Sequence, residues 1–263
     1  MDVDDLAKRW RDDLEAWAIP EEIVAAAPAN PWTHQVERFV RRTGALLAEP
    51  KGPTFERARE ALPPGGSVLD VGAGTGAAGL PLRPALLVAV DENPAMLAEL
   101  TRQAGGLRLE TIQGRWPDVA DRTPVADVVV CAHVVFNVPD LADFLAALDR
   151  HARSRVVVEL PAFHPTSWLN PLWERFHGLR RPSTPTANDA VAIAEALGFA
   201  VVREEYLSPD APFASPEEMA ASACRRLCLD PARAPEVIEA AHELGVWPAP
   251  RRSFMTMWWD TSG

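Results

Sequence analysis

The stretch "VLDVGAGTGAAG", from Val68 to Gly79, decides the fold of this chain. It reads as a short apolar strand that opens onto closely spaced glycines, where backbone N–H groups face a ligand at short range. From Gly74 onward it fits Gly-x-Gly-x-x-Gly, the pattern of a dinucleotide-binding turn. From Asp70 onward it is a carboxylate followed by Gly-x-Gly-x-Gly. The two patterns predict different cofactors.

Asp70 separates the two predictions. A carboxylate beside the turn repels the two negative charges of a pyrophosphate, whereas it attracts an ammonium or a sulfonium group. Asp91, at the end of the next apolar strand, suits the ribose hydroxyls of either cofactor and does not discriminate. The run "GLPLRP" (79–84) also places two prolines just after the turn, which is poor for the helix of a dinucleotide site. The turn therefore favours a cofactor with a cationic amino-acid tail.

Apolar runs and helical patterns alternate on both sides of this turn. Strands are expected at 67–72, 85–91, 107–114, within 126–138, and at 154–161. Helices are expected between them, at 93–105 and 141–152. This rhythm predicts an α/β fold with a doubly wound parallel sheet, whose ligands bind at the carboxyl ends of the strands.

The flanking segments depart from this rhythm. Residues 4–48 read as helices, and a further short helix at 54–66 leads into the first strand. The later chain has a helix at 186–198 and strand-like runs at 199–207 and 251–260, with helical patterns between them. We expect residues 1–60 to form an N-terminal helical cap or lid. We expect residues 61–263 to form the catalytic domain, with a helical insertion at about 212–245 as a candidate lid or homodimer contact.

Four segments together resemble the class I S-adenosylmethionine-dependent methyltransferases. They are "VLDVGAGTG" (68–76), "VAVDENPAML" (88–97), "GRWPDV" (114–119) and "ADVVVCAHVVFNV" (126–138), and they span roughly residues 60–160 in the family's order. The resemblance implies a Rossmann-like methyltransferase fold with a seven-stranded, mostly parallel sheet. Its seventh strand runs antiparallel between the fifth and the sixth. N-terminal helices and a helical insertion between the last two strands complete the expected fold.

The resemblance also implies S-adenosyl-L-methionine as the cofactor. Asp70 would orient the turn and meet the amino-acid end of the cofactor, and Asp91 would bind the ribose hydroxyls. Glu92 and Met96 would flank the ribose and the adenine, and His133 would lie beside the methyl group. The full expected cofactor set is Asp70, Gly72, Ala73, Gly74, Gly76, Asp91, Glu92, Met96, Arg115, Trp116, Ala132 and His133.

The adenine edge departs from the family pattern. Many relatives have an acidic residue after the third strand that accepts from the adenine amino group. This chain has Arg115 and Trp116 there. We expect Trp116 to stack on the adenine, with a backbone carbonyl or Asp118 accepting the amino proton.

The catalytic residue is harder to predict from the sequence than the cofactor-binding residues. Methyl transfer from a sulfonium is an in-line displacement in which positioning supplies much of the rate. A base is needed only if the acceptor must lose a proton. His133, after the fourth strand, is the first candidate for that base; the alternative is that it lines the cofactor without a proton role. His164, after the fifth strand, is the second candidate, or else a loop hydrogen bonder. The pattern does not decide whether Glu159 is buried or faces the site.

Three further residues are candidate substrate contacts. Each has a plain alternative: packing against the sheet domain for His34, a turn before a proline for Asn137, and core packing for Trp168. Three cysteines give neither a disulfide framework nor a four-ligand zinc spacing, so we expect no metal site.

Charge argues for a small acceptor molecule. The formal net charge is −11 and the arginine pairs are scattered, which disfavours binding to a nucleic-acid backbone. No apolar run approaches the roughly 20 residues of a membrane span, and the acidic N-terminus lacks a secretory signal, so we expect a cytoplasmic protein.

The function predicted from the sequence is therefore methyl transfer to an oxygen or nitrogen atom of a small molecule. Three alternatives stay open at this point: an RNA or protein methyltransferase, a cofactor-binding protein that has lost catalysis, and a dinucleotide oxidoreductase. The sequence leaves the oligomeric state open as well.

Overall fold

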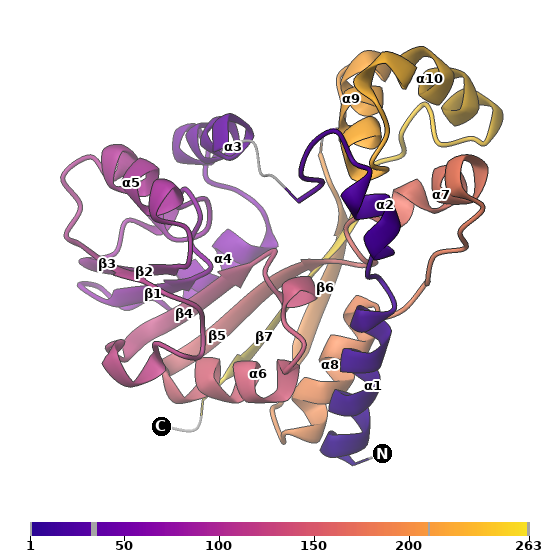
Figure 1. Ribbon diagram of the computed structural model, residues 1–263. Helices are drawn as coiled ribbons and strands as arrows, with labels where there is room; N and C mark the ends of the chain where they lie inside the picture. Colours follow the sequence, from indigo (N-terminus) through magenta and orange to yellow (C-terminus); the bar gives the residue numbers. More distant parts are fainter. Residues whose placement is uncertain (1, 33–35, 210, 262–263) are drawn as a thin grey trace.

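A seven-stranded sheet forms the centre of the molecule (Figure 1). The computed structural model describes residues 2–32, 36–209 and 211–261. The strands are β1 (Ser67–Val71), β2 (Leu86–Asp91), β3 (Leu109–Gln113), β4 (Ala126–Ala132), β5 (Ala152–Pro161), β6 (Val202–Leu207) and β7 (Ser253–Asp260). Their order is β3-β2-β1-β4-β5-β7-β6. Strands β1 to β5 pair in parallel, and β7 runs antiparallel between β5 and β6. The predicted α/β sheet and its antiparallel seventh strand are confirmed.

Helices surround this sheet. The α-helices are α1 (Val3–Glu15), α2 (Glu21–Ala25), α3 (Val36–Ala48), α4 (Pro53–Ala61), α5 (Pro94–Gln103), α6 (Leu141–Arg150), α7 (Asn170–His177), α8 (Ala187–Ala196), α9 (Pro216–Arg226) and α10 (Ala234–Glu243). Short 3₁₀ turns are η1 (Leu80–Leu82), η2 (Ala120–Arg122), η3 (Val135–Asn137), η4 (Ser167–Leu169) and η5 (Pro231–Arg233). Within the described ranges, none of these helices has the length and apolar character needed to cross a membrane.

The sheet is covered on both faces, as its continuously apolar strands require. Alternate residues of each strand point to opposite faces. One face packs against α1, α6 and α8, and the other packs against α4, α5 and η1. In β1, for example, Leu69 belongs to the first of these cores and Val68 to the second.

A separate apolar core lies beyond the carboxyl edge of the sheet. It is built from α7, α9, α10 and the turns beside them, and Met219, Ala223 and Val237 at its centre are fully buried. Figure 1 shows this helical part on one side of the carboxyl edge, with α3 on the other. The predicted helical insertion between the last two strands is therefore present as α9, η5 and α10.

Proline shapes the segment after the glycine turn. Pro81 lies inside η1, and the chain turns at Arg83, which has a φ of 47° just before Pro84. Proline removes a backbone donor and restricts the residue before it, so a long helix cannot form here. A single 3₁₀ turn replaces it. The five-residue helix α2 is an element that the apolar pattern did not indicate.

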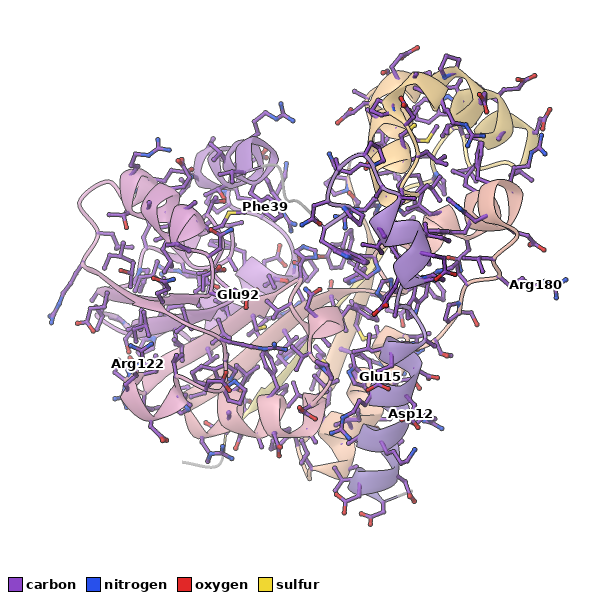
Figure 2. The ribbon with its side chains drawn as sticks, in the orientation of Figure 1. Asp12, Glu15, Phe39, Glu92, Arg122 and Arg180 are labelled. Carbon is purple, nitrogen blue, oxygen red and sulfur yellow. The ribbon has the colours of Figure 1, made fainter. Side chains whose placement is uncertain are left out.

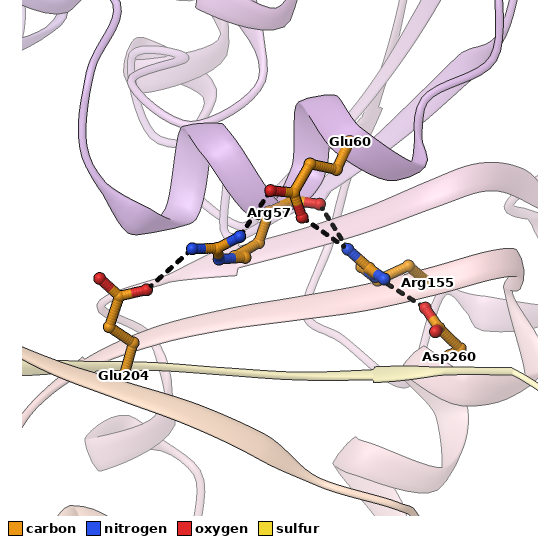
Figure 3. A network of polar contacts seen from close by, with 5 residues as sticks. All are labelled: Arg57, Glu60, Arg155, Glu204 and Asp260. Atoms are coloured by element: carbon orange, nitrogen blue, oxygen red, sulfur yellow. Dashed lines mark hydrogen bonds and ion pairs between the residues drawn. The ribbon is translucent and has the colours of Figure 1, made fainter.

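Ion pairs fix α4 to the edge of the sheet formed by β5, β7 and β6 (Figure 3). Arg57 bridges Glu60 on its own helix and Glu204 on β6, with 3.2 Å between Nη2 and Oε2 of Glu204. Arg155 on β5 contacts Glu60 and, through Nε at 2.7 Å, Asp260 on β7. Its Nη1 also donates to the backbone carbonyl of Arg57 at 3.1 Å. The network holds the C-terminal half of α4 against the sheet.

Helix α1 is anchored by one tryptophan. Trp10 is 1% exposed, stacks on Phe136 with ring centroids 5.6 Å apart, and donates its indole N–H to the carbonyl of Val138 at 2.8 Å. The apolar spacing of Leu6 and Trp10 on one face of α1 accounts for this packing. The helix thereby supports the loop that follows β4.

We expect Trp10→Ala to lower the free energy of unfolding by about 3–5 kcal/mol, because it empties a buried aromatic site and orphans a carbonyl. Urea unfolding at equilibrium measures this. Lys8→Ala, on the exposed side of the same helix, is the control and should change stability by less than about 0.5 kcal/mol. Equal effects of the two substitutions would contradict the anchoring role.

Candidate active site

The glycine turn after β1 lies directly beneath the loop after β4. The N–H groups of Gly72 and Ala73 donate to the carbonyl of Val90 on the neighbouring strand, at 2.8 and 3.0 Å. Gly72 has a φ of +70°, and a Cβ added there would lie 2.2 Å from a methyl carbon of Val134. Only glycine satisfies both conditions. The sequence therefore brings the turn and the residue after His133 into contact.

Gly74 is the open position of the turn. Its φ is +53°, and nothing lies within 4 Å of where a Cβ would stand. Its N–H donates to Asp91 Oδ2 at 2.8 Å, while the other carboxylate oxygen of Asp91 accepts from the N–H of Asn93 at 2.9 Å. The carboxylate at the end of β2 is thus held against the turn. The next residue, Glu92, is exposed (Figure 2).

Asp70 lies below the turn, not in its open face. It is 1% exposed, and its Oδ2 accepts from the N–H of Gly79 at 2.8 Å. A Cβ at Gly79 would stand 2.7 Å from that oxygen, so the glycine makes room for the carboxylate. Burial raises the pKa of Asp70 to about 7, although the Gly79 N–H opposes the rise. This bond ties the two ends of the turn together.

A buried carboxylate lies where the carboxyl ends of β4 and β5 meet the amino-terminal half of the antiparallel strand β7. Glu159 is 7% exposed. It accepts from the hydroxyl of Thr54 at 2.6 Å and pairs with Arg42 Nη2 at 3.0 Å. His133 Nε2 lies 2.7 Å from Glu159 Oε1, although the approach is too bent for a regular hydrogen bond. Thr256, opposite Glu159 on β7, contacts the Thr54 hydroxyl at 2.8 Å. Four separate elements therefore meet at one side chain.

The protonation states of this cluster follow from its contacts. Burial alone would raise the pKa of Glu159, but His133, Arg42 and Thr54 stabilise the carboxylate and bring the pKa well below its ordinary value. The pKa of His133 is also lowered, by burial and by Arg42, against the opposing effect of Glu159. The contacts therefore favour the ionised carboxylate of Glu159 and the neutral form of the His133 imidazole. Burial and Glu159 raise the pKa of the nearby Tyr206, whose hydroxyl stays protonated.

Helix α3 covers this edge of the sheet. Besides the Arg42 ion pair, the fully buried Thr43 contacts the Thr75 hydroxyl in the glycine turn at 2.7 Å. Figure 2 shows Phe39 on the same helix, on the half of the molecule that also holds Glu92. Two adjacent residues of α3 therefore bind the turn and the Glu159 cluster, and the helix connects these two parts of the site.

His164 follows β5 and lies in an aromatic wall. Its ring stacks on Trp17 at 3.9 Å and meets Phe136 edge-on at 5.6 Å. Nδ1 lies 2.9 Å from the hydroxyl of Thr166. Burial, together with the charges of Arg181 and Arg226, lowers the pKa of His164 to about 4. The imidazole is therefore neutral at physiological pH.

Comparison with known proteins identifies this arrangement. The fold is similar to that of the YcgJ protein of Bacillus subtilis, with a TM-score of 0.55 at 15% identity, over 85% of this chain and 99% of that one. It is also similar to magnesium protoporphyrin IX methyltransferase of Synechocystis with bound S-adenosylhomocysteine, with a TM-score of 0.51 at 17% identity, over 94% of each chain. No curated protein matches the sequence. The family model of a methyltransferase domain matches residues 68–155.

Residues 68–155 form a methyltransferase domain, and the fold of the chain is that of the class I, S-adenosylmethionine-dependent methyltransferases. The matched residues contain the glycine turn, Asp91 and His133, which are the parts of the site described above. The methyltransferase uses S-adenosylmethionine as its cofactor.

The turn of the methyltransferase fits this cofactor. The open space beside Gly74 allows a ligand to approach the backbone, and the ionisable Asp91 stands beside it with one oxygen on the Gly74 N–H. Asp70 is covered by protein, so its direct contact with the cofactor stays a prediction, whereas its bond to Gly79 is a contact that orients the turn. Met96 is buried at the first turn of α5.

The remaining predicted cofactor-binding residues differ in burial and in the contacts they make. Ala132 ends β4 opposite Glu159, and Gly76 closes the turn through its N–H to the carbonyl of Ala73. Arg115 is exposed. Trp116 is 5% exposed and meets His151 edge-on at 4.8 Å, so stacking on an adenine stays a prediction.

Of the predicted substrate contacts, Asn137 and Trp168 lie in different parts of the fold. Asn137 is exposed at the end of η3. Trp168 packs against Phe213, 5.1 Å away, in the helical part. His34 lies outside the described residues.

The sequence pattern missed the partners of Glu159. Arg42, Thr54, Tyr206 and Thr256 come from α3, α4, β6 and β7, at separations of 47 to 117 residues from the carboxylate. The one available signal was compositional: Thr256 is the sole polar residue between the apolar ends of "FMTMWW" (254–259), and Glu159 interrupts the apolar run of β5. Opposed polar residues in two buried strands are a sign of a polar contact.

We expect Gly74→Ala to weaken binding of S-adenosylhomocysteine about 10-fold or more, because a methyl group would enter the open face of the turn. Gly178→Ala is the matched control, since Gly178 also has a positive φ of +65° and open space around a Cβ, but caps the remote helix α7. Titration calorimetry measures both. Equal losses would show that backbone strain, and not the open face, explains the effect.

Asp70 should make folding depend on pH. Between about pH 4 and 7 the unfolded chain has lost this proton and the folded one keeps it, so stability falls as the pH rises through this window. Between pH 5 and pH 8, the free energy of unfolding should fall by about 2–3 kcal/mol more in the native protein than in the Asp70→Asn variant. Urea unfolding at both pH values measures the difference. Asp118→Asn, at an exposed carboxylate, is the control. If the free energy of unfolding depended on pH in the same way in the native protein and in Asp70→Asn, the raised pKa of Asp70 would be refuted.

Proposed function

We propose that this methyltransferase transfers the methyl group to an oxygen or nitrogen atom of a small molecule, with His133 as the base that removes the acceptor's proton. The observation that carries the proposal is the pair of the buried Glu159 and the half-buried His133, 2.7 Å apart, beside the glycine turn. A pure cofactor-binding protein has no need of an ionised carboxylate held against an imidazole. Such a pair is the arrangement by which a carboxylate orients a general base.

The chain's own residues divide the remaining work. S-adenosylmethionine supplies, when bound, a methyl group on a sulfonium that is already activated for displacement. The backbone around Gly74 binds the cofactor, Asp91 accepts from its ribose hydroxyls, and Glu92 and Met96 flank the adenosine. His133 accepts the acceptor's proton on its ring. Glu159 holds the ring in place and stabilises the positive charge that the ring then acquires.

The lowered pKa of His133 suits this role. A base must be unprotonated when the acceptor arrives, and burial together with Arg42 keeps the imidazole neutral at physiological pH. Glu159 limits the effect, because its charge favours the protonated ring. The imidazole is therefore neutral before the acceptor binds. When it accepts the proton, the Glu159 carboxylate is already beside it to stabilise the positive charge.

We assign His164 to the wall of the acceptor site and not to proton transfer. Its ring is packed between Trp17 and Phe136, and Nδ1 is engaged with Thr166. Helix α3 acts as the lid within the N-terminal residues 1–60, because it is the helix that binds both the turn and the Glu159 cluster. The α9–α10 insertion bounds the acceptor side.

The proposal of a small acceptor, in a cytoplasmic enzyme, rests on charge. The chain carries a net charge of −11, and Figure 2 shows the acidic Asp12 and Glu15 on α1. These features oppose a long polyanion such as RNA. A transfer assay with bulk tRNA that yields product at rates above those of every small acceptor would replace the proposal.

His133→Gln should reduce methyl transfer by a factor of about 10² to 10⁴, because the general base is lost. Binding of S-adenosylhomocysteine should stay within a factor of about 3 of native. The measurement is release of S-adenosylhomocysteine with a panel of phenols, carboxylic acids and amines, alongside calorimetry. Loss of cofactor binding with the substitution would assign His133 to the cofactor wall. No transfer to any acceptor by native protein that binds the cofactor tightly would favour a catalytically silent protein.

Glu159→Gln should lower kcat about 10- to 100-fold, since a charged partner of the base is removed. The acid limb of the kcat/KM profile should also move to lower pH. The reason is that Glu159 raises the pKa of His133, so its neutral replacement lets that pKa fall further. A merely structural role would reduce activity without moving the limb. Glu205→Gln, on the exposed strand β6, serves as the control.

A further inference from the structure

A cavity of about 290 Å³ lies between the loop after α2 and helix α9. Pro28 and Ala29 line it from the loop, and Ala221, Cys224 and Arg225 line it from α9. Figure 1 shows this loop beside α9. The lining residues are distinct from those of the glycine turn, the Glu159 cluster and the wall around His164. The cavity is therefore separate from the candidate active site.

The buried part of the lining is apolar. Cys224 is 1% exposed and Leu229 is 5% exposed, and both belong to the apolar core of the helical part. Burial raises the pKa of the Cys224 thiol, which therefore stays protonated and behaves as a small apolar group. On the open side, Pro28, Ala221 and Pro231 are exposed. An apolar ligand can thus enter from solvent and leave water on binding.

Arg225 is the charged member of the lining. In the described part of the chain its Nε is buried without a hydrogen-bond partner, and no acidic side chain pairs with it. The acidic side chains whose charges reach Cys224 have other partners. Asp230 accepts from a backbone N–H of η5 at 2.8 Å, and Glu236 pairs with Arg233 at 2.8 Å. The Arg225 guanidinium is therefore available to an anion.

We propose that this cavity binds an amphipathic monocarboxylate, with its apolar body on the Cys224 side and its carboxylate on the Arg225 guanidinium. The volume sets the size of the ligand. A water molecule takes about 30 Å³ of the liquid, so 290 Å³ corresponds to about ten non-hydrogen atoms. Octanoate has about this size. The site is additional to methyl transfer and does not rest on the proposed function.

The two parts of the lining favour such a ligand together. The apolar body gains from leaving water, and a guanidinium presents paired N–H donors that match both oxygens of a carboxylate. A neutral amide of the same shape keeps the apolar contribution and loses the ionic one. Because charged hydrogen bonds contribute more than neutral ones, the carboxylate should bind about 5- to 10-fold more tightly than the amide.

The test titrates octanoate and octanamide by calorimetry into full-length protein saturated with S-adenosylhomocysteine. The native protein should bind octanoate with a Kd of about 1 mM or tighter, and octanamide about 5-fold or more weakly. Arg225→Gln should remove this preference, while Arg175→Gln, at an exposed arginine on α7, should preserve it. Circular dichroism and binding of S-adenosylhomocysteine confirm that each variant is folded.

A second pair of variants locates the ligand. Ala221→Trp places a large side chain at the open side of the cavity and should abolish octanoate binding. Ala196→Trp, at an exposed alanine on α8, is the matched control and should leave octanoate binding unchanged. In the native protein, octanoate should also slow hydrogen exchange in residues 26–32, because the ligand contacts the loop and α9 at once.

The outcomes separate this inference from the proposed function. No binding of octanoate at the stated affinity overturns the inference, and so does octanoate binding that survives Ala221→Trp. Equal affinities for the two probes, or a preference that survives Arg225→Gln, overturn the role of Arg225. Methyl transfer to octanoate would locate it at the acceptor site and overturn the inference. Arg225-dependent octanoate binding by a protein that methylates no acceptor supports this site and refutes the proposed function.

Discussion

The buried charge of Glu159 is the constraint on which the site depends. An ion taken out of water costs several kcal/mol unless partners replace the lost hydration. The protein meets this cost with groups from α3, α4, the loop after β4 and the strand β7. Each of these elements has another reason to be present, as cover for the sheet or as part of the core. The carboxylate forces their ends to meet at one point, and that point lies next to the glycine turn.

Much of the fold was predictable because its signals are local. Apolar runs bounded by glycine and proline marked the strands, and Asn93 before Pro94 marked the start of α5, where the Asn93 side chain does accept from the N–H of Ala95. The strand order was not local information; it came from the resemblance to a family. The contact between the glycine turn and Asp91 was predictable for the same reason as the strands, since both lie within the 24 residues from Val68 to Asp91.

The acceptor side was not predictable in this way. The partners of Glu159 come from distant segments, and no spacing rule connects Arg42 or Thr54 with a strand a hundred residues later. Asp70 shows a second limit. Its charge pointed to a cationic cofactor, yet the structure places it beneath the turn, where burial raises its pKa to about 7. Sequence reveals that a carboxylate is near a turn; only packing reveals whether it is covered.

The position of strand β7 affects the order in which the cofactor site and the acceptor site form during folding. It enters the sheet between β5 and β6, so it completes both the hydrogen-bond ladder and the lining of the site. A slip of one residue would exchange Thr256 and Phe254 for Met255 and Met257 at the polar cluster. Because β7 follows β1 to β5 along the chain and β6 joins the sheet through β7, an intermediate without β7 holds the cofactor turn but lacks Thr256 and Phe254 beside the Glu159 cluster. Cofactor affinity would then arise before methyl transfer during folding, and the correct pairing of a single strand would turn a cofactor binder into an enzyme.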